Sequence, residues 1–449
     1  MTLNVLHDMW RYLPERLVKV ESRAISLNEP FIELVARYAH LPGTVALMSG
    51  GKSDCARYHI LGIRPWLTLL GNTTELTLST TERTIRVLAD PFATLDQIMR
   101  KYSTLPGMAN LPIAAGLLGY LSYDLKDCVE ELPRTSVDDL GLPHFYLNAP
   151  SILVVQDCLT GATSLHVPVF ETQRPDIQRW LSEFESALTS PAAPRAASEL
   201  RTGTFSSGFT RATYMSAIES IKDYIGRGHV YQVNMSQRFQ ATFEGDPFDF
   251  YARLYQRNPA AFFSYINAGD HQIVSSSPER FIQLDGSAVE TRPIKGTRPR
   301  GNTPEEDLLL RQDLETCAKD DAELSMIVDL LRNDIGKVCR ANSVRVTEHK
   351  RLEAYKNVYH LVSIVRGELD EGKNAVDLIR ATFPGGSITG CPKIRSMEVI
   401  DELEPVRRHI YTGSIGYLSF HGTMDLSIAI RTATIASGNV YFSVGGGIV

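Results

Sequence analysis

The chain has 449 residues, of which 43% are hydrophobic and 22% are charged. This composition is typical of a globular protein with a large core, and the length predicts two or three domain-sized units. The formal net charge of −6 argues against a nucleic-acid-binding protein, whose binding face is usually basic, and no apolar run is long enough to cross a membrane.

The six cysteines lie far apart in the sequence, and no two of them form a Cys-x-x-Cys motif. This spacing predicts reduced thiols in a cytoplasmic protein rather than a disulfide framework or a zinc site. The first sixteen residues mix Asp8, Arg11 and Glu15 with apolar residues. Such a mixture fits neither a signal peptide nor a membrane-spanning segment.

The first part of the chain, which we expect to end at residue 189, alternates between short strands and helices. The sequence Ser49-Gly50-Gly51-Lys52-Ser53 is only superficially similar to a phosphate-binding loop, because Ala46 stands where the first glycine of that motif belongs. We therefore reject a nucleotide site there. Hydrophobic periodicity predicts helices over residues 28–37 and 175–188, and strands over residues 44–48, 113–124, 151–156 and 164–169.

Residues 190–208 are rich in alanine, serine, proline, glycine and threonine. This change of composition predicts a linker between an N-terminal region, residues 1–189, and a second region, residues 209–449. Within the second region the periodicity predicts helices over residues 209–225 and 308–338, and strands over residues 230–239, 282–284, 288–291, 413–420, 426–432 and 440–444.

Two stretches of the second region bring an acid and a lysine close together in the sequence: Ser277-Pro278-Glu279-Arg280-Phe281 and Pro293-Ile294-Lys295-Gly296-Thr297-Arg298-Pro299-Arg300-Gly301. The hairpin predicted between them would turn Glu279 and Lys295 toward one pocket. A largely uncharged Lys295 near neutral pH requires a pKa about three units below the ordinary 10.4, which burial and nearby cations can supply. Such a lysine is a nucleophile or a base; an ordinary salt-bridged lysine is the alternative.

Further polar residues occur where apolar neighbours or glycines predict a buried or closely approached site. Arg431 lies inside a predicted apolar strand, where a guanidinium needs an anionic partner and suits a carboxylate. Asp320 and Glu323 are three residues apart near the middle of a predicted helix and project from one face. Residues 383–393 read as a loop before a helix that Thr389 caps, and such helix ends bind anions.

The motifs around Glu279 and Lys295 resemble the chorismate-binding family, and within it the aminodeoxychorismate synthase component I branch. The resemblance covers almost the whole chain. It implies an α/β fold of the α+β type, in which antiparallel β-sheets pack as a sandwich flanked by outer helices, as in anthranilate synthase component I. It also implies conversion of chorismate and ammonia to 4-amino-4-deoxychorismate, a precursor of 4-aminobenzoate and folate.

The resemblance implies a role for each site residue. Lys295 would form a covalent intermediate, Glu279 would protonate the leaving hydroxyl, and His360 would line the site. Mg²⁺ would be held by Glu323 and Asp320. The residues implied to bind chorismate are Thr297, Thr389, Tyr411, Arg431, Gly445, Gly446 and Gly447.

Two positions favour amination over related reactions. By resemblance, enzymes that add water to chorismate carry a lysine where this chain has Gln232, and anthranilate synthases carry an alanine where it has Lys295. The alternatives are an anthranilate synthase component I and a non-catalytic amino-acid-binding partner subunit. A metal-dependent hydrolase is disfavoured because the sequence has no histidine-rich ligand cluster.

Two further expectations concern partners and the end of the chain. No cysteine lies in the Gly-x-Cys-x-Gly motif of a glutaminase, so a glutamine amidotransferase subunit, component II, would supply ammonia in a heterodimer. Related chains continue beyond the glycine run into a helix whose glutamates complete the magnesium site, so we expect that helix to be missing after Val449.

The resemblance also implies a pocket for a tryptophan-like amino acid near the Ser49–Ser53 loop. Both halves of the chain would contribute to it, and an ordinary turn with local packing is the equal alternative. The residues implied to form the pocket are Ser49, Arg57, Tyr58, Ala261, Phe262 and Phe263.

Overall fold

A computed structural model describes residues 9–51, 53–103, 111–190 and 198–449. Lys52 of the Ser49–Ser53 loop, the first eight residues and residues 191–197 of the predicted linker lie outside these ranges. No helix among the described residues has the length and apolar character needed to cross a membrane.

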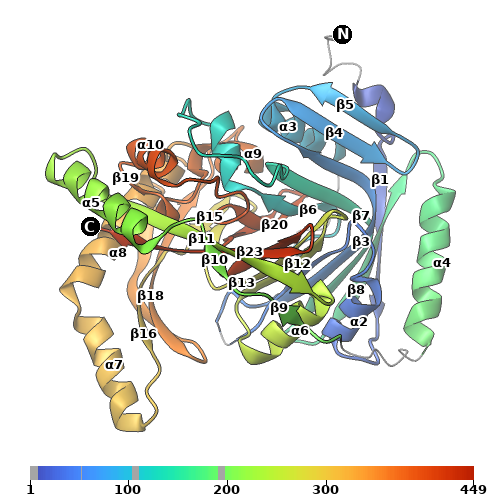
Figure 1. Ribbon diagram of the computed structural model, residues 1–449. Coiled ribbons are helices and arrows are strands. Elements are labelled where there is room, and N and C mark those ends of the chain that lie inside the picture. Colours follow the sequence, from blue (N-terminus) through green and yellow to red (C-terminus); the bar gives the residue numbers. More distant parts are fainter. Residues whose placement is uncertain (1–8, 52, 104–110, 191–197) are drawn as a thin grey trace.

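The helices lie mainly around the outside of the molecule, with α4 on one edge and α7 at the opposite end (Figure 1). Several begin at a side-chain cap followed by proline: Asp90 precedes α3, Asp246 precedes α6 and Thr303 precedes α7. The helices are α2 Phe31–Tyr38, α3 Pro91–Tyr102, α4 Pro175–Thr189, α5 Arg211–Gly226, α6 Pro247–Arg257, α7 Pro304–Thr316, α8 Ala318–Gly336, α9 Ala375–Thr382 and α10 Lys393–Leu403, with short 3₁₀ helices η1 Trp10–Tyr12, η2 Tyr123–Cys128 and η3 Gly386–Ile388.

The strands form one connected antiparallel network. In the first region they are β1 Leu17–Ile25, β2 Val45–Met48, β3 Tyr58–Gly71, β4 Glu75–Thr80, β5 Thr84–Leu88, β6 Gly116–Leu121, β7 Phe145–Asp157 and β8 Thr163–Phe170. In the linker and the second region they are β9 Arg201–Thr202, β10 Ser206–Ser207, β11 Gln232–Glu244, β12 Phe262–Asn267, β13 His271–Ser277, β14 Arg280–Asp285, β15 Ala288–Thr291, β16 Ile294–Pro299, β17 Arg345–Ala354, β18 Val358–Glu368, β19 Gly390–Cys391, β20 Ser414–Ser419, β21 Met424–Ile428, β22 Thr432–Ala436 and β23 Asn439–Ile448.

The two halves of the chain share these sheets. Strand β2 of the first half pairs with β12 of the second, and β6 pairs with β20. Trp66 of β3, with about 1% of its surface exposed, packs edge-on against Tyr102 and near Phe420 of the second half. The predicted α+β class with antiparallel sheets and outer helices is confirmed. The linker over residues 190–208 stays a prediction, and its short strands β9 and β10 pair with β11.

Four predictions about local structure differ from the structure. The helix predicted over residues 308–338 is interrupted at Cys317, so Asp320 and Glu323 lie near the start of α8 rather than in the middle of a long helix. Arg431 is not inside a strand. It occupies the bend between β21 and β22 with φ +51°, and its side chain is exposed to an open cavity rather than buried in the sheet.

Thr389 does not cap a helix. The N-cap residue of α10 is Pro392, and the Thr389 hydroxyl instead donates to the carbonyls of Gly385 and Gly386 within its own loop. The glycine run is also different from the expectation, because β23 continues through Gly445–Gly447 and pairs with β11 there. The strand is therefore longer than predicted. Glycine has no side chain and so adds nothing to the hydrophobic alternation from which the strand was predicted.

Candidate active site

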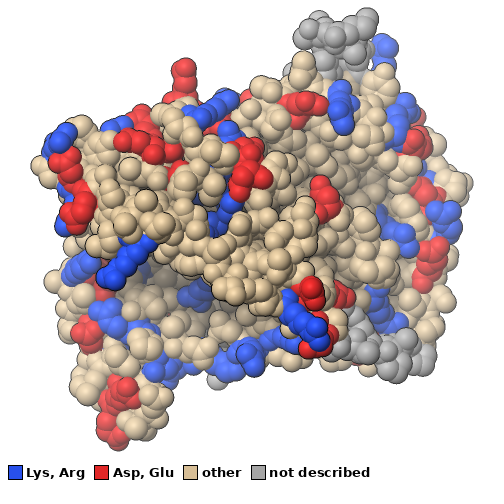
Figure 2. Space-filling view, in the orientation of Figure 1, with Lys and Arg blue, Asp and Glu red and all other residues tan. Residues whose placement is uncertain are grey.

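A cavity of about 710 Å³ lies among β11, β16, β18, β23 and the β21–β22 bend. Such a volume is within the usual range for small-molecule sites. Figure 2 shows the surface hollowed between the α7 end and the body of the molecule, with acidic and basic side chains intermixed around it. The predicted site residues that line the cavity are Glu279, Lys295, Thr297, His360, Tyr411, Arg431, Gly445, Gly446 and Gly447.

Glu279 lies between β13 and β14 and is 4% exposed. Burial raises the pKa of its carboxyl to about 7, against the lowering effects of the Ser387 hydroxyl, the Lys295 charge, the Ile294 backbone N–H and the Arg431 charge. A carboxyl with this pKa is partly protonated near neutral pH, so Glu279 is able to act as a general acid.

Lys295 projects from β16, and its ammonium has an anionic neighbour. The Nζ atom lies 3.1 Å from Glu323 Oε1 and donates to the Ser387 carbonyl at 3.0 Å. Glu323 Oε1 also accepts from Gln232 Nε2 at 2.6 Å. The charged group beside Lys295 is therefore a carboxylate, whereas we expected nearby cations.

His360 and Arg431 contact one another at the cavity, next to Thr297 of β16. Arg431 Nη2 lies 3.1 Å from His360 Nε2, and His360 Nδ1 lies 2.9 Å from Thr297 Oγ1. Burial, with a smaller contribution from Arg431, lowers the pKa of His360 to about 4. Because a guanidinium only donates, the neutral imidazole accepts at Nε2 and carries its proton on Nδ1. His360 thus orients Arg431 without competing with it for an anion.

The glycines of β23 leave space for polar groups of β11. A Cβ atom at Gly445 would lie 2.9 Å from both Asn234 Oδ1 and the Tyr411 hydroxyl, and one at Gly447 would lie 2.8 Å from Glu323 Oε1. Burial raises the pKa of Tyr411 to about 12, so its phenol remains a hydrogen-bond donor. These glycines are thus required by close approach of side chains.

Sequence reasoning missed two polar residues at this site. Asn234 lines the cavity and its Oδ1 is buried without a hydrogen-bond partner; the alternation of β11 placed it on the same face as Gln232, which was the available signal. Ser387 also lines the cavity and contacts both Glu279 and Lys295. Nothing in the local pattern of its loop indicated this.

The predicted metal ligands lie beside the cavity, on the side of Lys295. Asp320 packs over Gly296, and its Oδ2 forms an ion pair with Arg298 Nη1 at 3.1 Å. Among the described residues no group of three histidine, cysteine, aspartate or glutamate side chains is arranged to hold a metal. Two carboxylates suit magnesium, which commonly keeps several waters and takes substrate oxygens.

Five of the six residues predicted for a tryptophan pocket surround a small cavity of about 50 Å³: Ser49, Tyr58, Ala261, Phe262 and Phe263. Arg57 instead pairs with Asp157 at 3.0 Å and lies over the Tyr58 ring. Ligand pockets usually exceed roughly 300 Å³, so a bound amino acid would need this cavity to widen, and tryptophan binding stays a prediction.

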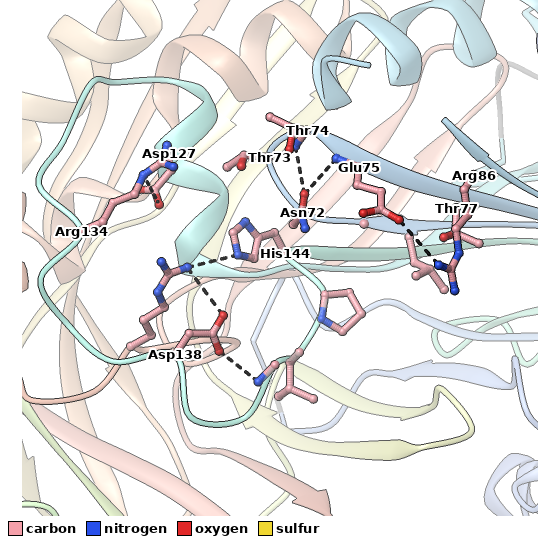
Figure 3. Close-up of a pocket in the computed structure, with 16 residues that line it drawn as sticks. Asn72, Thr73, Thr74, Glu75, Thr77, Arg86, Asp127, Arg134, Asp138 and His144 are labelled. Carbon is pink, nitrogen blue, oxygen red and sulfur yellow. Dashed lines mark hydrogen bonds and ion pairs between the residues drawn. The ribbon is translucent and has the colours of Figure 1, made fainter. Parts of the chain in front are cut away.

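A further cavity of about 560 Å³ lies away from the site, between the β3–β4 turn and residues 127–144 (Figure 3). Each arginine on its wall has a carboxylate neighbour. The pairs are Arg134 with Asp127 at 3.3 Å, Arg407 with Asp138 at 3.8 Å and Arg86 with Glu75 at 3.9 Å. The charges of this wall cancel in pairs.

Residues 53–449 match the sequence family described as chorismate binding enzyme. The chain is 42% identical over 412 residues to aminodeoxychorismate synthase component 1 of Salmonella typhimurium, covering 91% of this chain and 88% of the relative. It is 40% identical over 433 residues to anthranilate synthase component 1 of Pseudomonas aeruginosa, covering 93% and 88%. The crystal structure of anthranilate synthase component I from Streptococcus pneumoniae superposes with a TM-score of 0.77 at 32% identity, covering 89% and 88%.

Proposed function

The chain belongs to the chorismate binding enzyme family, and from this premise we propose that it is an aminodeoxychorismate synthase component I, which replaces the C4 hydroxyl of chorismate with an amine. The observation that carries the proposal is the convergence of Lys295, Glu279 and Arg431 on one cavity. It joins a nucleophile, a carboxyl with a pKa of about 7 and a cation for a dicarboxylate substrate.

Chorismate would be held by its two carboxylates. Arg431 offers a guanidinium fork to the side-chain carboxylate, and Tyr411 adds a protonated phenol. Magnesium, when bound through Glu323 and Asp320, would supply positive charge for the ring carboxylate. His360 keeps Arg431 in place through the 3.1 Å contact at Nε2.

The reaction is a substitution in two covalent steps. Lys295, once its ammonium has lost a proton, attacks C2 to form a C–N bond. The two ring double bonds shift and the C4–O bond breaks, while Glu279 gives its proton to the departing oxygen so that water leaves. Ammonia then gives its electron pair to C4, the two ring double bonds shift back, and the C2–N bond breaks with its electron pair leaving on the Lys295 amine, while the added ammonium loses a proton. Splitting the substitution in this way lowers each barrier.

The similar aminodeoxychorismate synthases are named component 1. This name supports a separate glutamine amidotransferase partner as the source of ammonia. The product would serve 4-aminobenzoate and folate synthesis in the cytoplasm. Anthranilate synthase component I remains the second candidate, because one relative of that name is nearly as similar. Lys295 favours amination with the enolpyruvyl group retained, since the resemblance places alanine there in anthranilate synthases.

Intact-mass analysis tests the covalent role of Lys295. The wild-type protein, incubated with chorismate and Mg²⁺ without ammonium, is expected to gain the mass of chorismate less one water. Lys295→Ala should show no such adduct, and Lys356→Ala, which removes an exposed lysine that donates to the Arg257 carbonyl, should behave as wild type. An adduct of equal yield in Lys295→Ala would overturn the role of Lys295.

Removal of the metal gives a separate test of the carboxylate pair. Chelation of Mg²⁺ should abolish turnover and leave the melting temperature nearly unchanged, because Glu323 and Asp320 already have Lys295 and Arg298 as ionic partners. Turnover that survives thorough chelation would contradict the assignment of these ligands.

A further inference from the structure

The loop of residues 383–389 contacts both of the proposed reacting side chains through one residue. The Ser387 carbonyl accepts from Lys295 Nζ at 3.0 Å, and the Ser387 hydroxyl lies beside the Glu279 carboxyl on the wall of the same cavity, where it lowers the pKa of Glu279. Ser387 is 6% exposed and lines the cavity. We propose that Ser387 is a positioning residue that couples the acid Glu279 to the nucleophile Lys295, an inference that rests on the proposed function.

A buried lysine fixes the start of this loop. Lys393 Nζ donates to the carbonyls of Thr382 at 2.7 Å and Pro384 at 2.8 Å, and it pairs with Asp334 of α8. The Lys393 side chain is 11% exposed and that of Asp334 is 2% exposed. Charge-assisted bonds in such dry surroundings are stronger than neutral ones. The first carbonyls of the loop are therefore tied to the helix that carries Glu323.

A buried arginine fixes the end of the loop. Arg408 donates from Nη1 to the Ile388 carbonyl at 2.9 Å and from Nη2 to the Asn234 carbonyl at 2.6 Å. Its Nε and Nη2 also form a bidentate pair with Glu404, which in turn accepts from the Ser236 backbone and hydroxyl. Arg408 therefore fixes the distance between the loop of residues 383–389 and strand β11.

Lys393 and Arg408 thus donate hydrogen bonds to carbonyls at the two ends of the loop. Lys295 donates to the Ser387 carbonyl, which lies between them. Glycines allow the loop to pack closely: a Cβ at Gly385 would lie 2.6 Å from Ile428 Cδ1, and one at Gly386 would lie 2.7 Å from Leu330 Cδ2. A loop fastened in this way has little freedom to move Ser387 away from Glu279 and Lys295.

The hydroxyl has a measurable electrostatic consequence. The groups that face Glu279 are the Ser387 hydroxyl, the Lys295 ammonium, the Ile294 backbone N–H and the Arg431 guanidinium, and each of them lowers its pKa against the effect of burial. Removing the hydroxyl beside the charged carboxylate should raise the pKa of Glu279 by about one unit. The protonated acid, and hence turnover, should persist to higher pH.

The test compares Ser387→Ala with Thr382→Val, a matched variant immediately before the loop. The Thr382 hydroxyl bonds only to carbonyls of Leu378 and Ile379 among the described contacts, so its loss should weaken this segment without altering the electrostatics at Glu279. In kcat/KM against pH for ammonium-dependent amination, the alkaline limb should move up by about one unit in Ser387→Ala and stay in place in Thr382→Val. Ser387→Cys, similar in size with a weaker donor, serves if the alanine variant does not fold, and should shift the limb in the same direction.

An alkaline limb that does not move in the Ser387 variants, or that moves equally in Thr382→Val, would overturn the inference. The titration of Glu279 can also be read without turnover, from the carboxyl ¹³C resonance that disappears in Glu279→Gln. A higher titration midpoint in Ser387→Ala supports the coupling even if no amination is found, in which case only the proposed function fails. Identical midpoints in wild type and Ser387→Ala would overturn the coupling while leaving amination untouched.

Discussion

The active-site cavity and the cavity of Figure 3 are similar in size, about 710 and 560 Å³, and both have several charged side chains on their walls. They differ in how those charges are matched. In the cavity of Figure 3, Arg134, Arg407 and Arg86 each have a carboxylate within 4 Å. In the active site, Lys295 is also paired, with Glu323 at 3.1 Å, but Arg431 has a neutral histidine as its hydrogen-bond partner and Glu279 is buried with a raised pKa.

The difference shows that neither volume nor the number of charges identifies a site. Paired charges are satisfied within the protein and gain little from a ligand. A guanidinium that faces an uncharged imidazole keeps its capacity to bind an anion, and a carboxyl kept partly protonated by burial keeps a proton to give. Burying a charged or ionisable group without an ionic partner lowers the stability of the folded protein. The presence of several such groups in one cavity therefore indicates a function.

Loss of Lys295 should have the largest effect. In Lys295→Ala the amination of chorismate with ammonium should fall by about a thousand-fold or more, because no nucleophile remains to form the covalent intermediate. The Lys295–Glu323 pair is also lost, so the folded state should be checked by circular dichroism. Amination at near the wild-type rate in a folded variant would remove the distinction between the two cavities.

Glu279→Gln should have the next largest effect, a loss of about 10²- to 10⁴-fold in kcat, because an amide cannot protonate the leaving oxygen. Wild-type activity should decline as pH rises through about 7, where Glu279 loses its proton. Since its folded pKa lies above the unfolded value of 4.5, the stability that the protonated group contributes should also decline as pH rises from about 4.5 to about 7, and Glu279→Gln should lack this decline. Urea unfolding at several pH values measures it; equal pH dependence in both proteins would contradict the raised pKa.

Arg431→Gln should chiefly impair binding. The KM for chorismate should rise by about 10- to 100-fold, as expected for loss of a charge-assisted contact to a carboxylate, while kcat changes less. The fold should hold, because the Arg431 side chain is exposed to the open cavity. Steady-state kinetics with varied chorismate measure both constants. An unchanged KM would mean that Arg431 does not contact the substrate.

Arg407→Gln, in the cavity of Figure 3, should have the smallest effect. Its guanidinium lies 3.8 Å from Asp138 and 3.4 Å from His144 Nε2, long contacts that contribute less than about 1 kcal/mol to stability. Amination kinetics should match wild type and the melting temperature should change little. A strong loss of activity in a stable Arg407→Gln protein would show that paired charges can also mark a working site.

The family resemblance named most of the residues that line the cavity. The local pattern indicated only part of the site: Glu279 and Lys295 lie on either side of the predicted β14–β15 hairpin, and Gln232 lies on the predicted strand β11. His360 lies on β18. The fold class followed from a family resemblance that spans almost the whole chain, and periodicity supported only a mixture of helices and β-hairpins.

The errors arose where tertiary contacts override local pattern. Apolar neighbours suggested a strand at Arg431, but the chain bends there to connect two paired strands. Lys295 is paired with Glu323 of α8, nearly thirty residues along the chain, a contact that no spacing rule predicts. Ser387 escaped notice because its importance depends on Lys393 and Arg408, which fasten its loop from α10 and from the segment before β20.

Product identity tests the central claim most directly. The wild-type protein, incubated with chorismate, Mg²⁺ and an ammonium salt, should form a product that has gained an amine in place of the hydroxyl and has kept its enolpyruvyl group, as shown by liquid chromatography with mass spectrometry. A fluorescent aminobenzoate formed with release of pyruvate would instead mark an anthranilate synthase. Unconsumed chorismate would contradict amination by this chain altogether.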